Sequence, residues 1–217
     1  MQTIDTLLFD LDGTLVDSNE LILDTLVKTF EIHFPKLSFS RIELIQMMGP
    51  PLSETFGKHT EDLALIETMI QTYRTVYKSQ EFDYITIYPH VIDALKRFKA
   101  AGFHIGIVTT KFKVSAMPSI RHFGIDQYID VVIGLDDVIN HKPHPEPIYK
   151  ALDQFSHQGA VMIGDSPADL LAGINANILT CGVDWSYKKH ELLALKPDFW
   201  LKDFADLFEM ISKYNYS

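Results

Sequence analysis

Short apolar runs recur along the chain and alternate with stretches in which apolar residues have a helical spacing. The runs lack polar alternation, which predicts strands buried on both faces. They cover residues 6–9, 104–108, 131–133, 160–163 and 178–183, with 199–201 at an edge. Helices are predicted over residues 91–101, 114–123, 147–155 and 167–175. Strands that alternate with helices favour βαβ units, so we predict an α/β fold with a parallel sheet and helices on both faces.

Residues 17–85 depart from this alternation, because only helical patterns occur there. Helices are predicted over residues 20–34, 40–48, 52–56 and 61–80. Ser40 and Glu43 have the spacing of a capping box, in which each side chain bonds the other residue's backbone N–H. An all-helical block directly after the first strand indicates an inserted domain. We therefore predict an α/β core of residues 1–16 and 86–217 and a helical cap of residues 17–85.

Composition narrows the class of protein. A chain of 217 residues with 47% hydrophobic content can bury one sizeable core and a smaller unit. The net charge of −10 argues against nucleic acid as a partner, and the lack of a long apolar run argues against a membrane span. Cys181 is the only cysteine, so no internal disulfide can form and the cytoplasm is the expected compartment. The sequence carries no indication of the oligomeric state.

The first predicted strand ends in Asp10-Leu11-Asp12-Gly13-Thr14. Open α/β sheets build their sites at the carboxyl ends of strands, and alternate residues of an extended segment point to the same side. Two carboxylates aimed into one cleft repel each other unless a cation neutralises them or one carries a proton. Both conditions suit phosphoryl transfer with Mg²⁺, with one carboxylate as nucleophile and the other as acid and base. The alternative is an Asp-Gly turn that carries surface acids.

Three further segments resemble known motifs. Residues 108–111 read Val-Thr-Thr-Lys, residues 141–147 read His-Lys-Pro-His-Pro-Glu-Pro, and residues 163–169 read Ile-Gly-Asp-Ser-Pro-Ala-Asp. In this order after residues 10–14, they resemble the phosphatases of the haloacid dehalogenase superfamily that carry a helical cap. The resemblance covers nearly the whole chain. It implies a Rossmann-like core, an aspartyl-phosphate intermediate and a Mg²⁺ cofactor.

The resemblance implies roles for five residues. Asp10 is the nucleophile that attacks phosphorus. Asp12 protonates the leaving oxygen and later takes a proton from water, and its backbone carbonyl binds the metal. Thr109 holds a phosphate oxygen, and Lys142 neutralises both the phosphate and Asp10. Asp165 supplies a second carboxylate to Mg²⁺.

Four other positions have weaker signals. Asp169 either orients Asp165 or a metal-bound water, or is a favourable charge at a helix N-terminus. Thr110 and Lys111 are candidates for substrate binding, and the alternative for Lys111 is an ordinary solvated lysine. The backbone at Gly49, in a Gly-Pro-Pro stretch, is a further candidate for substrate binding or else a plain connector.

Within the family, the chain is similar to bacterial phosphoglycolate phosphatases and to the inorganic pyrophosphatases related to them. We therefore predict a cytoplasmic Mg²⁺-dependent phosphohydrolase that acts on a small phosphorylated substrate, with inorganic pyrophosphate expected. One alternative is a phosphoglycolate phosphatase, and another is a phosphomutase of the β-phosphoglucomutase kind. A third alternative is a catalytically silent binding protein on the same fold.

Overall fold

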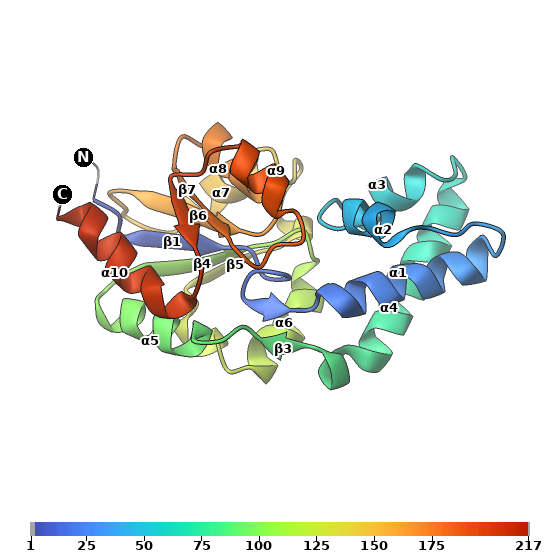
Figure 1. Cartoon of the computed structure of the whole chain (residues 1–217), viewed down its shortest axis with the longest axis horizontal. Helices are drawn as coiled ribbons and strands as arrows, with labels where there is room; N and C mark the ends of the chain where they lie inside the picture. Colours follow the sequence, from blue (N-terminus) through green and yellow to red (C-terminus); the bar gives the residue numbers. More distant parts are fainter. Residues whose placement is uncertain (1–2, 217) are drawn as a thin grey trace. The chain divides into compact units, whose positions relative to one another are not determined.

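The computed structural model describes residues 3–216, which divide into two compact units (Figure 1). One unit combines the segment that ends at Val16 with the segment that begins at Ile87, and the other is Asp17–Thr86. Strands β2 (Val16–Asp17) and β3 (Thr86–Ile87) pair with each other where the chain passes between the units. These two strands were not predicted from the sequence, because two residues are too few to show a periodic pattern.

The first unit contains a parallel sheet in the order β5-β4-β1-β6-β7-β8. Its strands are β1 (Thr6–Phe9), β4 (His104–Val108), β5 (Val131–Ile133), β6 (Ala160–Gly164), β7 (Leu179–Val183) and β8 (Phe199–Leu201). Every residue of β1 and β6 is buried, which explains why both strands are apolar without alternation. The predicted α/β fold is confirmed, and residues 199–201 form an edge strand as expected.

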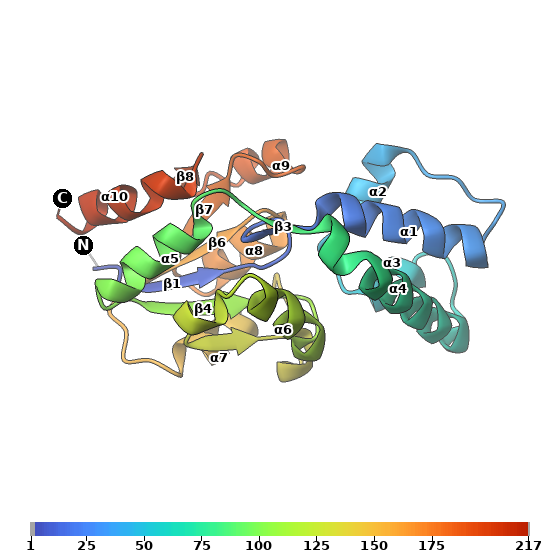
Figure 2. The same ribbon diagram turned by 90° about the horizontal axis from the view of Figure 1, so that it is seen from below.

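Helices cover both faces of this sheet (Figure 2). They are α5 (Val91–Ala100), α6 (Lys113–His122), α7 (Glu146–Leu152), α8 (Pro167–Asn175), α9 (Lys189–Ala194) and α10 (Phe204–Asn215), with short 3₁₀ helices at Asp126–Tyr128 and Leu135–Asp137. Leu8 packs in one cluster with Ile148 of α7 and Ala172 of α8. Phe9, which points to the other face, packs against Phe204 of α10 with ring centroids 6.2 Å apart. Successive residues of β1 therefore anchor the two helical layers.

Helix α10 was missed by the sequence analysis, although its signals are present. Asp203 caps the helix and accepts a hydrogen bond from the Ala205 N–H at 2.8 Å. Phe204, Leu207 and Ile211 are all buried at a helical spacing. Helix α9 was also not predicted from the sequence.

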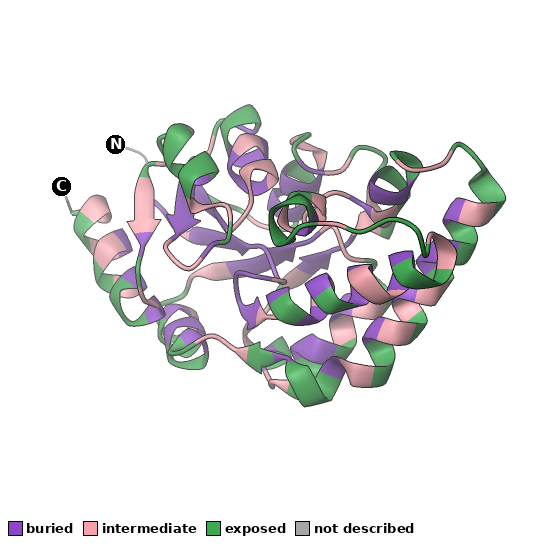
Figure 3. Ribbon diagram, turned by 45° about the vertical axis from the view of Figure 1, so that its right-hand side comes forward, coloured by how far each residue is buried: buried purple, intermediate pink, exposed green. Residues whose placement is uncertain are grey.

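The second unit contains four helices within Asp17–Thr86. They are α1 (Asn19–His33), α2 (Arg41–Met47), α3 (Leu52–Gly57) and α4 (Leu63–Tyr84). Buried and exposed stripes alternate around these helices, as the burial colours in Figure 3 show. The capping box at α2 is confirmed: the Ser40 N–H donates to Glu43 Oε2 at 2.7 Å, and the Glu43 N–H donates to Ser40 Oγ at 3.3 Å.

Helix α4 is longer at its C-terminal end than predicted. Asp62 caps its start by accepting from the N–H groups of Ala64 and Leu65, so Glu61 lies outside the helix. The helix continues past Gln80 because no glycine or proline interrupts it and Glu81 stays buried on the same side as Tyr77. No helix within residues 3–216 is long and apolar enough to cross a membrane.

Candidate active site

The strand order concentrates the predicted site residues at one edge of the sheet. Counted along the chain, the six strands lie in the order 3-2-1-4-5-6, and such sheets bind ligands at the carboxyl ends beside the point where the order reverses. Strand β1 lies at that point, between β4 and β6. Asp10, Thr109 and Asp165 directly follow these three strands. The backbone N–H of Asp10 still donates to the Ile163 carbonyl at 2.9 Å, so the sheet ladder fixes the base of this side chain.

Lys142 links the site across the sheet edge. Its ammonium group donates to Asp10 Oδ1 at 2.7 Å, to Asp169 Oδ1 at 2.6 Å and to the Val108 carbonyl at 2.7 Å. These three bonds match the three N–H donors of a lysine, and only 2% of the side chain is exposed. Burial alone would lower the pKa of Lys142, but the two carboxylates outweigh it and raise the pKa above its usual value. Lys142 is therefore a fixed positive charge inside the site.

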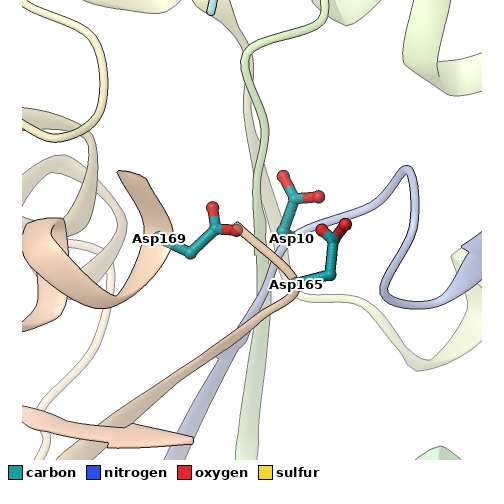
Figure 4. Close-up of side chains that lie close together, drawn as sticks. All are labelled: Asp10, Asp165 and Asp169. Carbon is teal, nitrogen blue, oxygen red and sulfur yellow. The ribbon is translucent and has the colours of Figure 1, made fainter. Parts of the chain in front are cut away.

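Three carboxylates surround that charge. One oxygen from each of Asp10, Asp165 and Asp169 lies within 4.8 Å of the others, and the side chains converge in Figure 4. Burial raises the pKa of Asp10 to about 7, with Lys142 opposing and Asp169 reinforcing that shift. Burial also raises the pKa of Asp165, and the nearby Asp10 and Asp169 add to the effect. A site with more carboxylates than ammonium groups favours a divalent cation, which would relieve their repulsion.

Asp169 differs from the other two because both of its oxygens are already bonded. Oδ1 accepts from Lys142, and Oδ2 accepts from the Ser166 N–H at 2.9 Å and from the Ser166 hydroxyl at 2.7 Å. The side chain thereby holds both the lysine and the first turn of α8. The geometry favours the orienting alternative for Asp169 over direct metal ligation.

Asp165 receives a hydrogen bond that the sequence analysis did not predict. The hydroxyl of Thr14 donates to Asp165 Oδ1 at 3.2 Å. The turn that brings Thr14 back requires the left-handed backbone of Gly13, which has φ 85°. The Gly-Thr pair after the two aspartates could have indicated this contact. A glycine turn places the side chain of the next residue beside the strand end.

The loop after β4 brings Lys111 to Asp12. Lys111 Nζ lies 3.4 Å from Asp12 Oδ1, and both side chains are partly exposed. The Lys111 N–H donates to Thr109 Oγ1 at 3.1 Å, which fixes the start of the loop. Thr110, between Thr109 and Lys111 in the sequence, is half-buried. Lys111 is therefore not an isolated surface lysine, because it pairs with the predicted acid.

Gly49 lies in the other unit, between α2 and α3, where its φ is 101°. Its predicted part in substrate binding stays a prediction.

Comparison with known proteins supports the motif-based interpretation. Residues 7–183 match the family model described as haloacid dehalogenase-like hydrolase. A Bacillus pumilus protein named Pyrophosphatase PpaX is 41% identical over 213 residues, which cover 96% of this chain and 97% of the relative. A Halalkalibacterium halodurans protein of the same name is 36% identical, with coverage of 96% and 97%.

Solved structures show the same architecture. A haloacid dehalogenase-like hydrolase from Streptococcus pneumoniae superposes with a TM-score of 0.81 at 27% identity, and covers 95% of this chain and 98% of its own. A Haemophilus somnus protein named as a predicted phosphoglycolate phosphatase superposes with a TM-score of 0.83 at 26% identity, with coverage of 97% and 99%.

The fold, the acidic sheet edge and these matches define the class of protein. The chain belongs to the haloacid dehalogenase-like hydrolase family. The family predicted from the motifs is confirmed, and so is the prediction that the protein is an enzyme.

A substitution at Gly164 tests how tightly this site is packed. A Cβ at this position would overlap the Asp169 side chain, which Lys142 and Ser166 hold in place. We expect Gly164→Ala to lower the free energy of unfolding by roughly 1–3 kcal/mol and to reduce turnover. Urea unfolding and a phosphate-release assay measure the two effects. Gly57→Ala is the control, because a Cβ there meets only Ile66 Cδ1 at an ordinary 3.8 Å. Wild-type stability and turnover in Gly164→Ala would refute the close-packing argument.

Proposed function

We propose that this protein is a Mg²⁺-dependent phosphohydrolase that forms an aspartyl-phosphate on Asp10 and uses inorganic pyrophosphate as its substrate. The observation that carries the proposal is the buried Lys142 bridge between Asp10 and Asp169, beside Asp165, at the carboxyl edge of the sheet. This arrangement keeps a carboxylate and a fixed cation where a phosphoryl group can bind. Family membership supports the reaction class.

Asp10 is positioned to act as a nucleophile. Its backbone is tied to β6, and its Oδ1 accepts from Lys142, which leaves the second oxygen for in-line attack. In the first step an Asp10 oxygen–phosphorus bond forms, and the bond between phosphorus and the leaving oxygen breaks. In the second step water attacks phosphorus, and the Asp10 carboxylate is released together with phosphate.

Asp12 is the proposed acid and base of both steps. In the first step its proton passes to the leaving oxygen, and in the second step its carboxylate takes a proton from the attacking water. Proton transfer needs an accessible group, and Asp12 is partly exposed whereas Asp10 is buried. The hydroxyl of Thr109, which directly follows β4 beside β1, holds an oxygen of the transferred phosphoryl group. The positive charge of Lys142, which bonds Asp10, offsets the negative charge of that group.

The donor set fits Mg²⁺. Asp10, Asp165 and the backbone carbonyl of Asp12 would hold the ion, and these oxygen donors are the ligand type that Mg²⁺ prefers. Three carboxylates within 4.8 Å with one lysine among them leave negative charge to be neutralised. When bound, Mg²⁺ neutralises that charge and draws electrons from a phosphate oxygen.

The choice of pyrophosphate is supported by relatives and by one contact. The Bacillus pumilus relative that covers nearly the whole chain is named a pyrophosphatase. Lys111 Nζ lies 3.4 Å from Asp12, the group that protonates the leaving oxygen, so an anionic leaving group would meet a cation there. Phosphoglycolate also has an anionic leaving group, and the Haemophilus somnus neighbour named for it makes it the second candidate.

We also propose that residues 17–85 act as the cap that selects the substrate, and that Gly49 contributes backbone contacts from it. The resemblance of the four ordered motifs to capped phosphatases supports this division, as does the compact helical unit at Asp17–Thr86. We propose that the enzyme is cytoplasmic, which is consistent with a small phosphorylated substrate.

Asp10→Asn tests the nucleophile. An amide has nearly the same shape but is a poor nucleophile, so kcat should fall by several powers of ten while the protein stays folded. Phosphate release from pyrophosphate measures kcat, and circular dichroism checks folding. Asp153→Asn is the control, because Asp153 is exposed just beyond α7 and should keep full activity. Retention of more than about a tenth of wild-type activity by folded Asp10→Asn would contradict the covalent mechanism.

Metal removal tests the cofactor. Activity should disappear on chelation and return with Mg²⁺ but not with Ca²⁺, because Ca²⁺ takes more ligands in a looser shell and would misplace the attacking carboxylate. The measurement is phosphate release after dialysis against a chelator, followed by titration of each ion. Full activity after chelation without added metal would rule the cofactor out.

Lys111→Ala tests the substrate. Loss of a charge-assisted hydrogen bond to the leaving group should lower kcat/KM for pyrophosphate by roughly 1–3 kcal/mol in transition-state free energy. The loss should be much smaller for an aryl phosphate, whose leaving group has no second anion. Exposed Lys96→Ala is the control for lysine removal. A panel of pyrophosphate, phosphoglycolate and hexose phosphates ranks the substrates, and equal losses on pyrophosphate and aryl phosphate would withdraw the role of Lys111.

A further inference from the structure

Two adjacent residues after β7 reach the two segments that carry the proposed metal ligands. The indole N–H of Trp185 donates to the Gly13 carbonyl at 3.0 Å. The hydroxyl of Ser186 donates to the Asp165 carbonyl at 2.5 Å. Gly13 follows Asp12 directly, and Asp165 is itself a proposed ligand, so one short loop bonds both segments.

The Trp185 bond completes the fixation of the turn at Gly13. The Gly13 N–H already donates to the Val16 carbonyl at 2.7 Å. Because a trans peptide points its C=O opposite to its N–H, that bond also sets the direction of the Asp12 carbonyl, the proposed backbone ligand. With the Gly13 carbonyl held by Trp185, both peptide groups that flank Gly13 are fixed in direction.

The Ser186 bond likewise fixes the direction of the peptide group that follows Asp165. The peptide group between Asp165 and Ser166 donates through its N–H to Asp169 Oδ2 at 2.9 Å and accepts through its C=O from Ser186. The Asp165 side chain accepts from Thr14 at 3.2 Å. Backbone and carboxylate are thus restrained together, which limits the directions in which the carboxylate can point.

The loop is a rigid support because its own flanks are anchored. The Asp184 N–H donates to the Leu201 carbonyl at 2.8 Å, and Asp184 Oδ1 accepts from Lys189 Nζ at 2.5 Å and from the Trp200 indole at 2.7 Å. The side-chain bonds from Lys189 and Trp200 lower the pKa of Asp184. The Trp185 ring packs 5.4 Å from the ring of Phe204, which in turn packs on Phe9 of β1.

We propose that Trp185 and Ser186 are positioning residues that preorganise the Mg²⁺ site through the backbone carbonyls of Gly13 and Asp165. They act through other residues, as partners outside the ligand set commonly do in metal sites. The inference rests on the proposed function, since it concerns the proposed ligands Asp12 and Asp165.

The test uses the full chain and measures Mg²⁺ binding by calorimetry, apart from activity. Trp185→Phe keeps an aromatic ring but removes the N–H, and Ser186→Ala removes the hydroxyl. Each should raise the Kd for Mg²⁺ by about tenfold. Two matched controls should leave the Kd unchanged: Tyr149→Phe, which keeps an aromatic ring and removes a hydroxyl that donates to the Asn175 carbonyl, and Ser119→Ala, a buried serine that donates to a helix carbonyl in α6.

Steady-state kinetics provide a second readout. The Mg²⁺ concentration for half-maximal activity should rise in Trp185→Phe and Ser186→Ala, while KM for pyrophosphate and the melting temperature of the metal-free protein stay near the wild-type values. Ser186→Thr, which keeps a hydroxyl, should restore Mg²⁺ affinity relative to Ser186→Ala.

The outcomes separate this inference from the proposed function. Wild-type Mg²⁺ affinity in both Trp185→Phe and Ser186→Ala would overturn the positioning role. An equal loss of affinity in both matched controls would also overturn it, because the effect would then be general destabilisation. Absence of Mg²⁺ binding by the wild-type protein would instead overturn the proposed cofactor. If either variant fails to fold, the other decides the question.

Discussion

The site depends on one buried ammonium group, that of Lys142. It is the shared partner of Asp10 and Asp169 and also holds the Val108 carbonyl at the end of β4. Breaking a buried ion pair by removing one partner typically costs about 3–5 kcal/mol, because the remaining charge has no compensation. The loop that carries Lys142, the first turn of α8 and the end of β1 are therefore held together by one charge.

The order of the strands explains why such a charge cluster can form there. Placing β1 between β4 and β6 brings three strand ends together where the order of the sheet reverses. Each strand is followed directly by a polar residue: Asp10, Thr109 and Asp165. Gly164 permits the close approach of Asp169, since any side chain there would overlap it. Packing and charge thus constrain the same few positions.

In the proposed function, reaction class and substrate depend on different parts of the chain. Lys142 and the acidic residues at the strand ends belong to the core unit and lie within the residues that match the family model. The contact between Lys111 and Asp12, which we propose acts on the leaving group, is longer than the contacts of Lys142, and both of its side chains are partly exposed. Exposed groups can adapt to different leaving groups at small cost, whereas the buried cluster cannot change without losing its compensation.

The sequence by itself determined the strands of the parallel sheet, most helices and the motif residues, because buried strands must be continuously apolar and the proposed catalytic groups follow directly after them. It also identified the family. Only the tertiary structure decided that Asp169 bonds through both oxygens, that Thr14 supports Asp165, and that Trp185 and Ser186 hold the Gly13 and Asp165 carbonyls. Helix α10 combines both situations. The sequence shows the helical spacing of its apolar residues, but only the structure shows that Phe204 of this helix packs against Phe9. The physical reason is that periodicity reports which side of an element is buried, whereas a hydrogen bond between distant segments depends on how the whole chain packs.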